Sequence, residues 1–503
     1  MTRKIIFWLD ANFVHFGLAE ALKRKTNDEL YAIFDITDEP KNFYQEQKIV
    51  DFKKIWFYHN FINLKNKTPD IEYLKSFEEK YNTNLWLLAY NDRYLYTYNE
   101  YYNFSEDEIL LILEQECKMF EKILDEISPD FIIMPSTTAQ HNELFSIISR
   151  SKGIKMLMMG STRFGNRQII SQVLDKIDYI DENESIETEK FSFEELQKFH
   201  DSYNMSNMVG NYIKNFQSST FSYIRAAFHY LFKSETNQKT HFSYYGRNKF
   251  RVMFKLFAYT LRMKLRESFM NKNLAKSVDT SKPFIYFPLH QEQERTLLLG
   301  APYSTNQLEM IKHIVKSLPI GYNLIIKDPP IQITRGWRSI SELKKIIELP
   351  NVKLVHWSIP SKNIMKKCSL VISIKGSSAI ECAFYGKPAI VFSNVGYLNL
   401  NSITKVKNLE FLPNAIRTAL NTEVDLDELN KYVALMKKHS FEFNYSKIYL
   451  DFANQFHHNG FFADTPMNEL EVKNFLKKHS QSFDYLAVEH IKKLEEHELK
   501  TKY

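Results

Sequence analysis

One stretch, residues 370–392, constrains the fold of this chain more than any other. Its sequence, LVISIKGSSAIECAFYGKPAIVF, joins two short apolar runs through a polar turn and a short helical segment. Residues 370–374 are too few and too rich in β-branched side chains for a helix, so they predict a buried strand. The turn Lys375-Gly376-Ser377-Ser378 follows, and its serines can cap a helix. Gly386-Lys387-Pro388 ends that helix before a second strand over residues 389–392, so we predict a β-α-β unit.

The turn between these two strands has the chemistry of an anion site. The first backbone N–H groups of a helix lack partners within the helix, and Lys375, Gly376, Ser377 and Ser378 surround them here. We expect these four residues to bind a phosphate. Glu381 follows about one helical turn later, where its carboxylate can reach groups beyond the phosphate, such as ribose hydroxyls. The alternative is that Ser377 only caps the helix of an ordinary β-α-β unit.

Upstream of this unit, short apolar runs alternate with amphipathic segments. The apolar runs are residues 284–287, 323–327 and 352–355, and the amphipathic segments are residues 306–318 and 339–349. This alternation predicts a parallel, doubly wound sheet, whose ligands bind beyond the carboxyl ends of the strands. The Lys-Gly-Ser-Ser turn lies at such an end.

The first half of the chain predicts a second α/β domain. Apolar strand patterns and amphipathic helix patterns alternate along it, in strands 4–9, 131–134 and 155–159 and helices 12–25, 105–127 and 143–151. The loops 137–141 and 161–167 would then follow strands and face a cleft between the two halves. At this side we assign acceptor binding to Asp10, His15, Arg163 and Arg167. For the two arginines the alternative is a solvated surface position.

Between the halves, the sheet pattern disappears and the chain becomes basic. From Arg225 to Lys276 there are twelve basic residues against two acidic ones, interleaved with phenylalanine and tyrosine. This pattern predicts basic helices with an aromatic side, which can dock on an anionic membrane or can form a solvated linker. We expect no nucleic-acid partner, because no RNA- or DNA-binding module accompanies the patch and the formal net charge is only +6.

Length and patterning together suggest four regions. With 503 residues, 44% of them apolar, the chain can bury substantial cores. We predict an N-terminal Rossmann-like domain over residues 1–190, a helical basic aromatic region over 191–280, a C-terminal Rossmann-like nucleotide-sugar-binding domain over 281–400, and C-terminal helices over 401–503.

Other classes of protein are disfavoured by what the sequence lacks. No run approaches the about 20 apolar residues that span a bilayer, and Asp10 interrupts the apolar start where a signal peptide stays apolar. We therefore expect a cytoplasmic protein. Cys117, Cys368 and Cys382 form no CxxC pair and have no histidines at metal spacing, so buried thiols are expected. Without HExxH or a P-loop, neither metal nor cofactor is expected.

The motifs of the second half, taken in order, carry a resemblance. Tyr286-Phe287-Pro288-Leu289-His290, then Lys327-Asp328-Pro329-Pro330, then the GSSAIECAFYGKPAIVF run resemble the capsule polysaccharide biosynthesis family. The resemblance covers about residues 283–397 and is weaker at 128–133 and 161–167. That family is similar to GT-B glycosyltransferases, including the Kdo transferases of capsule and lipopolysaccharide assembly. The resemblance therefore implies two Rossmann-like parallel-sheet domains that face a cleft, with a helical region between them and a helical C-terminus.

The same resemblance implies an activity. It favours a glycosyltransferase that uses CMP-Kdo or another CMP-linked acidic sugar, with UDP-sugars possible, and an acceptor in bacterial surface polysaccharide or lipopolysaccharide. In that scheme Lys327 and Lys375 neutralise the phosphate. His290, Glu292 and Glu294 follow the first strand of the second domain and are the candidate catalytic residues, as general base, nucleophile or proton shuttle. The alternative is that residues 290–295 form a solvated loop.

One position departs from the family pattern. The family has a His-Pro pair after the lysine strand, whereas this chain has Pro329-Pro330. Lys327, Arg335 or Arg338 could supply the missing donor contact. Two other functions stay open for this reason: a nucleotide-sugar 2-epimerase on the same architecture, and a non-catalytic protein that binds glycan or partner enzymes.

Overall fold

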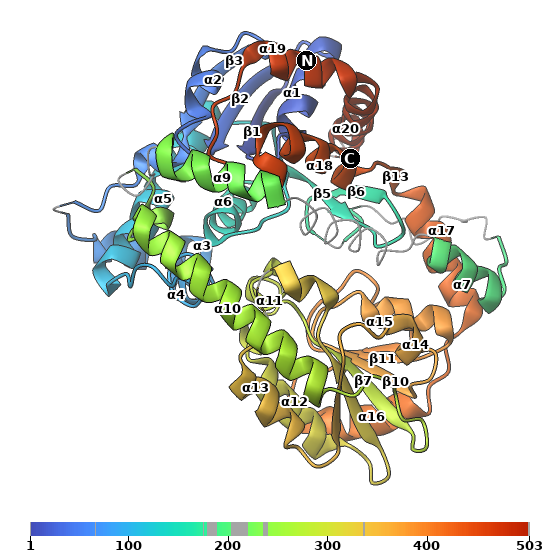
Figure 1. The fold of residues 1–503 in the computed structure, drawn as a ribbon. Coiled ribbons are helices and arrows are strands. Elements are labelled where there is room, and N and C mark those ends of the chain that lie inside the picture. Colours follow the sequence, from blue (N-terminus) through green and yellow to red (C-terminus); the bar gives the residue numbers. More distant parts are fainter. Residues whose placement is uncertain are drawn as a thin grey trace.

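The computed structural model describes residues 2–65, 67–174, 176–178, 189–202, 220–234, 240–334, 336 and 338–500. Two parallel-dominated sheets, each covered by helices, lie one above the other (Figure 1). The predicted α/β architecture of two Rossmann-like domains is confirmed. Arg335, one of the three candidates for the missing donor contact, lies outside the described residues.

The second sheet is parallel throughout. Its strand order is β12-β11-β10-β7-β8-β9, so the chain starts in the middle, winds to one edge and then returns to wind to the other. The strands are β7 (Phe284–Pro288), β8 (Asn323–Lys327), β9 (Val352–Val355), β10 (Leu370–Ser373), β11 (Ala389–Val391) and β12 (Ile403–Lys405). The strand order reverses between β7 and β10, which is where doubly wound sheets place their ligands.

The helices that cover the second sheet are α11 (Arg295–Leu298), α12 (Gln307–Ser317), α13 (Ile340–Ile347), α14 (Ser361–Met365), α15 (Ser378–Glu381) and α16 (Leu412–Leu420). Helices α12, α13 and α15 follow the predicted helical segments, whereas the short helices α11 and α14 were not predicted. The apolar faces of α12 and α13 pack on one face of the sheet with Ile285 and Leu324, because successive strand residues point to opposite faces. The other face buries Phe284, Tyr286 and the helical segment after β10.

The first sheet repeats the same winding. Its order is β13-β6-β5-β4-β1-β2-β3, and neighbouring strands are parallel except that β6 pairs antiparallel with both β5 and β13. The strands are β1 (Lys4–Asp10), β2 (Glu29–Asp35), β3 (Phe52–Phe57), β4 (Phe131–Pro135), β5 (Lys155–Ser161), β6 (Arg167–Ser171) and β13 (Phe441–Glu442). The main helices of this domain are α1 (Val14–Lys25), α2 (Lys41–Glu46), α3 (Ile71–Tyr81), α4 (Leu85–Tyr90), α5 (Glu106–Ile127) and α6 (Gln140–Ser151).

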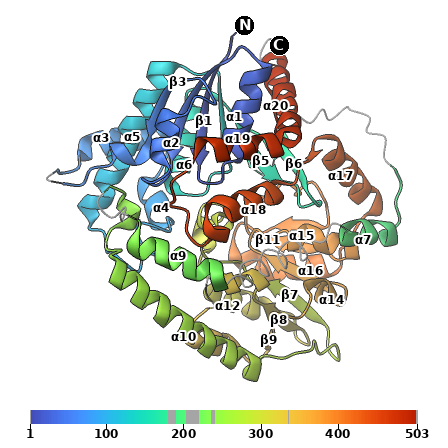
Figure 2. The ribbon, with the colours of Figure 1, turned by 45° about the horizontal axis from the view of Figure 1, so that its top comes forward.

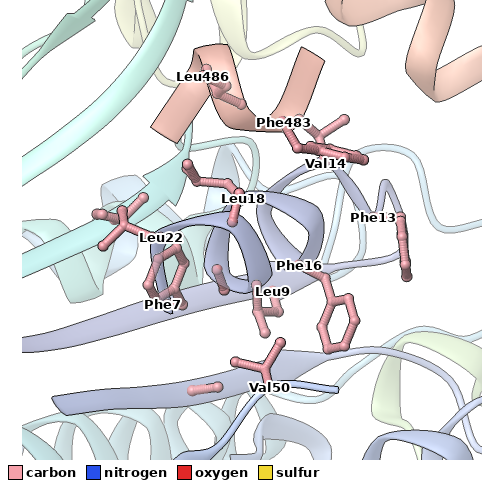
Figure 3. Close-up of a cluster of buried hydrophobic side chains, with 14 of the residues drawn as sticks. Phe7, Leu9, Phe13, Val14, Phe16, Leu18, Leu22, Val50, Phe483 and Leu486 are labelled. Carbon is pink, nitrogen blue, oxygen red and sulfur yellow. The ribbon is translucent and has the colours of Figure 1, made fainter. Parts of the chain in front are cut away.

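The C-terminal helices return to the first domain. Helices α18 (Tyr445–Phe456), α19 (Glu469–Lys478) and α20 (Ser480–Lys500) lie beside α1, so the two chain ends are neighbours (Figure 1). Phe483 and Leu486 of α20 pack against Val14 and Leu18 of α1 (Figure 3). A Cβ atom at Gly17 would lie 2.3 Å from the Phe483 ring, so this close helix approach requires glycine. The predicted helical C-terminus is confirmed, but strands β12 and β13 within it were not predicted.

The connection between the two domains is helical, as predicted. It contains α7 (Phe193–Ser202), α9 (Thr220–Phe232) and α10 (Lys249–Asn273). Figures 1 and 2 show α10 running along one side of the molecule, from the neighbourhood of α4 and α5 to the neighbourhood of α12. Its last turns anchor in the second domain, where Met270 and Leu274 join the core. Helix α17 (Leu426–Lys438) precedes the return of the chain to β13.

Candidate functional site

A cavity of about 400 Å³ lies between the two domains, where strands of both sheets end. From the first domain it is lined by residues just after β4 and at the end of β5. From the second domain it is lined by loops that follow β7, β10 and β11. The residues that line it include Arg93, Thr138, Thr162, Arg163, Lys176, Glu294, Arg295, Lys375, Ser377 and Tyr397. Both sheets thus present the carboxyl ends of their strands, which is where α/β proteins bind ligands.

The charged lining of this cavity is almost entirely cationic. Five of its lining residues are basic, namely Arg93, Arg163 and Lys176 from the first domain and Arg295 and Lys375 from the second. Glu294 is the one acidic residue among those that line it in the described part of the chain. Because positive side chains come from both walls, the cavity favours a ligand with negative charge facing both domains.

The Lys-Gly-Ser-Ser turn forms part of the second-domain wall, and hydrogen bonds to neighbouring side chains fix its backbone. The Gly376 N–H donates to Ser373 Oγ at 2.9 Å, and its carbonyl accepts from the Tyr397 hydroxyl at 2.6 Å. A Cβ atom at position 376 would lie 2.8 Å from Ser373 Oγ and 2.9 Å from His290 Nε2. Glycine is therefore required here because the turn packs directly on two side chains. Lys375 and Ser377, on either side of it, line the cavity.

The helix after the turn begins as predicted, with Ser377 as the residue before its first turn. Helix α15 is only four residues long and continues as a 3₁₀ turn over Cys382–Tyr385, which ends at Gly386 with φ 66°. The side chain of Ser377 makes no hydrogen bond to cap this helix. Ser377 also lines the cavity, so its hydroxyl is placed to contact a ligand. Ser378 and Glu381 are half-buried on α15 and are not among the lining residues.

His290 lies beneath the turn. Its Nε2 accepts the Lys375 N–H at 3.4 Å, and burial, with the Arg338 charge nearby, lowers its pKa to about 4. The ring is therefore neutral near neutral pH. The His290 backbone is fixed by Gln307, which accepts its N–H at 2.7 Å and donates to its carbonyl at 3.0 Å. The structure thus places this predicted catalytic residue as a support of the Lys-Gly-Ser-Ser turn, and it does not line the cavity.

Glu292 belongs to a buried charge network. The guanidinium of Arg338, whose side chain is fully buried, contacts Glu292, Asp328 at 2.9 Å and Glu342 at 3.0 Å. Burial opposes the charge of Arg338, but the three carboxylates more than offset this and raise its pKa. Burial also raises the pKa of Glu292 and of Asp328. Arg338 further donates to the His290 carbonyl at 2.8 Å, so the network supports the loop after β7.

Of the three predicted catalytic residues, only Glu294 lines the cavity. It precedes α11, four residues beyond His290, and its side chain does not cap that helix. Glu292 is directed to Arg338, away from this role. The loop over residues 290–295 is therefore ordered against the rest of the domain and is not a solvated loop.

Lys327 lies close enough to Glu381 of α15 for the two charges to interact. Lys327 is 3% exposed and donates to Ser361 Oγ at 2.8 Å. Burial lowers its pKa to about 8, against the opposing charges of Glu381 and Asp328. Neither Lys327 nor Glu381 lines the cavity. Neither Lys327 nor Arg338, the two described candidates for the missing donor contact, is directed into the cavity.

On the opposite wall, Arg163 is presented by a strained loop. Its backbone has φ 67°, in the left-handed region that an arginine rarely adopts, and such strain is commonest at ligand sites. The next residue, Phe164, is buried in the core of the second domain, with its ring 5.6 Å from that of Phe384 and 5.9 Å from that of Tyr432. Phe164 therefore anchors the loop across the cleft and fixes Arg163 at the cavity.

Two cavity arginines were not predicted as site residues. Arg295 reaches across the cleft, where its Nε donates to Thr137 Oγ1 at 2.9 Å and its NH2 lies 3.9 Å from Glu143. Because Arg295 directly follows Glu294, a predicted catalytic residue, its position in the sequence could have identified it as a site residue. Arg93 donates to the carbonyl of Thr138. Nothing in the tyrosine-rich sequence around it marks it as a ligand residue.

The other predicted acceptor residues lie away from the cavity. Arg167 donates to the Lys437 carbonyl at 2.7 Å and to Ser440 Oγ at 2.8 Å, so it holds the returning C-terminal chain. His15 is 1% exposed in α1, where burial, with His490 nearby, lowers its pKa to about 3. Asp10 ends β1 and bonds Asn12, and burial raises its pKa to about 6.

Three further features bear on the class of protein. The part of the chain that the structure describes contains no group of three or more His, Cys, Asp or Glu side chains that could hold a metal ion. Among the described residues, no helix is both long enough and apolar enough to cross a membrane. All three cysteines are buried and unpaired, and burial raises the pKa of each thiol.

No protein-family model matches this sequence, and no curated protein matches it. The resemblance to the capsule polysaccharide biosynthesis family therefore stays a prediction.

Solved structures with a partial likeness include three kinds of protein. The Thermosulfurimonas dismutans KpsC β-Kdo 2,7 transferase is 10% identical, with 64% of this chain and 89% of that chain covered and a TM-score of 0.28. The Methanocaldococcus jannaschii UDP-GlcNAc 2-epimerase, solved with UDP-GlcNAc and UDP, is 12% identical, with 86% and 99% covered and a TM-score of 0.26. Anabaena HepE, solved with UDP-glucose, is 13% identical, with 90% and 99% covered and a TM-score of 0.26. Likeness at this level is too loose to carry a conclusion about activity.

Proposed function

We propose that this protein is a glycosyltransferase of GT-B architecture that binds a nucleotide-sugar donor in the cavity between its domains. The observation that carries the proposal is the cationic lining of that cavity, with basic side chains from both walls at the carboxyl ends of both sheets. A nucleotide sugar carries its negative charge on phosphate, and an acidic sugar carries a carboxylate as well. In this proposal the second-domain wall binds the phosphate and the first-domain wall binds the sugar.

The donor in this proposal is CMP-Kdo or another CMP-linked acidic sugar, with a UDP-sugar as the second choice. The sequence resemblance to capsule and lipopolysaccharide Kdo transferases supports the first choice. Arg93, Arg163 and Lys176 on the first wall also support it, because a neutral sugar would leave those cations without a partner on the ligand. The proposed acceptor is a bacterial surface polysaccharide or lipopolysaccharide.

The proposed chemistry uses groups that line the cavity. Lys375 and Arg295 stabilise the charge that develops on the leaving phosphate, and Ser377 binds its oxygens. Glu294 is the carboxylate within reach of a bound sugar and acts as general base on the acceptor hydroxyl or as nucleophile. His290, buried and neutral, holds the turn in place. Metal is not required in this scheme, because cationic side chains carry out charge stabilisation.

The first experiment measures binding. Thermal unfolding is followed with CMP, UDP, GDP and their sugars, since a ligand that binds only the native state raises the apparent stability. CMP and CMP-Kdo should raise the melting temperature most. In the folded double variant Ser377→Ala with Ser378→Ala this shift should be strongly reduced, whereas Arg417→Gln, an exposed residue of α16, should leave it unchanged. If no nucleotide shifts the wild-type protein, the proposal fails.

The second experiment measures turnover of the bound donor with and without a glycan acceptor. Transfer that requires acceptor supports the glycosyltransferase, and Glu294→Gln should abolish it while nucleotide binding persists. Release of an epimerised sugar without acceptor would instead identify a nucleotide-sugar epimerase. Tight binding with no turnover of any donor would identify a non-catalytic binding protein.

A further inference from the structure

Helix α10 exposes a continuous apolar stripe. Five large apolar residues recur along it at intervals of three or four, and 48% to 89% of each side chain is exposed: Phe250, Phe254, Phe257, Leu261 and Leu265. At 3.6 residues per turn these positions fall within an arc of about 80°. Single apolar side chains on a protein surface are ordinary, but a continuous row of them is not. Such a row on a helix indicates a surface that binds a partner or a membrane.

A second row of exposed apolar side chains lies on helix α9. Ile224, Phe228 and Phe232 recur there at intervals of four and are also exposed. Lys249, the first residue of α10, donates to the Leu231 carbonyl of α9 at 2.9 Å, which ties the two helices together. Figures 1 and 2 both show α9 and α10 as neighbours on one side of the molecule. The α9–α10 face is defined here by these eight exposed apolar residues.

Positive charge accompanies this face. Helix α10 carries seven basic residues and one acidic residue, Glu267. By helical geometry Arg251 and Arg262 border one side of the stripe and Lys264 borders the other. All three side chains are exposed. An apolar row between basic borders is the arrangement of helices that lie in a lipid interface, with aromatic rings inserted and cations at the headgroups.

We propose that the α9–α10 face docks on an anionic lipid surface, with the helix axes in the plane of that surface. A second copy of this chain is the poorer occupant, because pairing the face with itself would bring seven basic residues on each α10 together with one acid on each side. An anionic membrane supplies both the apolar layer for the phenylalanines and the negative headgroups for the cations.

Contacts connect this face to the cavity. Lys255 of α10 lies 3.8 Å from the Glu100 carboxylate, and in the same segment the Tyr98 hydroxyl donates to the Glu292 carbonyl at 3.2 Å. Glu292 stands two residues before Glu294, which lines the cavity. Docking through α10 therefore holds the loop after β7, and the cavity beside it, close to the lipid surface. Given the glycosyltransferase function proposed above, this places a lipid-linked glycan within reach of the donor.

The test is co-sedimentation of the full chain with vesicles of equimolar phosphatidylglycerol and phosphatidylcholine, compared with vesicles of phosphatidylcholine alone. Wild-type protein should bind the anionic vesicles, release as salt rises and bind neutral vesicles much more weakly. Arg251→Gln with Arg262→Gln and Lys264→Gln should weaken binding about a hundredfold. Phe254→Ser with Phe257→Ser should weaken it at least about tenfold at constant charge.

Matched controls separate this face from general effects. Phe411 and Leu470 are 64% and 68% exposed on other helical segments, so Phe411→Ser with Leu470→Ser removes as much exposed apolar surface elsewhere. Lys122→Gln with Arg417→Gln and Lys477→Gln removes three exposed charges elsewhere. Both controls should bind vesicles like wild type. Thermal shifts with CMP should be unchanged in every variant, so loss of docking is distinguished from failure of the nucleotide site.

Three results would overturn the proposal. One is wild-type protein that ignores anionic vesicles at low salt. Another is vesicle binding that survives both sets of substitutions on the α9–α10 face. The third is a dimer in solution, measured by light scattering, that Phe254→Ser with Phe257→Ser dissociates while no vesicle binding is found, since this would assign the face to a second copy.

Discussion

The two walls of the cavity are built in different ways. The second-domain wall is a backbone turn clamped by neighbours in the same domain, with Ser373 and His290 beneath Gly376 and Tyr397 above it. The first-domain wall consists of long basic side chains, and its loop is fixed by Phe164, which packs in the core of the other domain. The turn of the second wall is thus held within its own domain, whereas the loop that carries Arg163 is held by both domains.

This difference separates two tasks. A rigid backbone turn suits a group that every donor shares, namely the phosphate. Side chains that span the cleft suit the part that distinguishes donors, the sugar, because their positions depend on how the domains meet. Substitutions on the two walls, compared in pairs, test this division.

Removing Arg338, which supports the loop after β7, should reduce the stability of the protein most. Arg338→Gln leaves the buried Asp328 and the half-buried Glu292 and Glu342 without their shared cation, and breaking a buried ion pair in this way typically costs about 3–5 kcal/mol in unfolding free energy. The matched substitution Arg167→Gln, in the first domain, removes an arginine that bonds mainly to carbonyls and a hydroxyl. It should cost about 1–3 kcal/mol. Chemical denaturation of both variants checks this, and equal losses would contradict the contrast between the walls.

The buried Lys327 should give the second domain a pH-dependent stability. Its folded pKa is about 8 against an ordinary 10.5, so the unfolded chain binds the proton more tightly and stability rises as pH increases from about 8 to 10.5. Lys327→Met removes this rise. Its unfolding free energy relative to wild type should therefore fall by about 3 kcal/mol between neutral pH and about pH 11.

The control for this measurement is Lys477→Met, an exposed lysine of α19, whose difference from wild type should not change with pH. Denaturant titrations at each pH provide the comparison. A constant difference for Lys327→Met would show that this lysine is not held in a buried site.

Neutralising one cation on each wall should separate nucleotide from sugar recognition. Lys375→Gln should weaken CMP and CMP-Kdo alike, because the lost charge faces the phosphate. Arg163→Gln should weaken CMP-Kdo by about tenfold to a hundredfold and CMP much less, because charged hydrogen bonds are worth about 1.5–3 kcal/mol. Isothermal titration calorimetry with both ligands gives the four affinities. If the two variants show the same pattern, the walls do not divide the ligand.

Adding one methyl group, by a glycine-to-alanine substitution, should destabilise the turn of the second wall more than a strand of the first domain. Gly376→Ala places a Cβ atom 2.8 Å from Ser373 Oγ and 2.9 Å from His290 Nε2, and should cost about 1–3 kcal/mol and distort the turn. Gly160→Ala, on β5, places a Cβ atom closest to the flexible end of Leu174, at 3.3 Å, with Ile169 at an ordinary contact distance of 3.8 Å, and should be nearly neutral. Melting temperatures and the CMP-induced shift report both effects. A nucleotide shift retained in full by Gly376→Ala would argue against the turn as the phosphate site.

Much of the second domain could be predicted because its signals are local. Strand β10, the start of α15 at Ser377 and the stop at Gly386 follow from β-branched residues, a polar turn and a left-handed glycine within one short run, although Ser377 does not cap the helix with its side chain. The alternation of strands and helices also indicated the first sheet through β1, β4 and β5, although its strands β2, β3 and β6 were not predicted. The two short strands β12 and β13 were missed, because two or three residues carry too little pattern and their pairing partners are distant in sequence.

The site was only partly predictable for the same physical reason. Sequence by itself determined two parallel α/β sheets, a polar turn at a strand end and a basic aromatic connection, since each depends on residues a few positions apart. Tertiary structure alone decided that His290 supports the turn, that Arg338 engages Glu292, that Arg93 and Arg295 reach the cavity, and that α10 turns its phenylalanines outward. Burial, charge pairing and convergence across a cleft depend on contacts between residues far apart in the chain, and no local pattern encodes them.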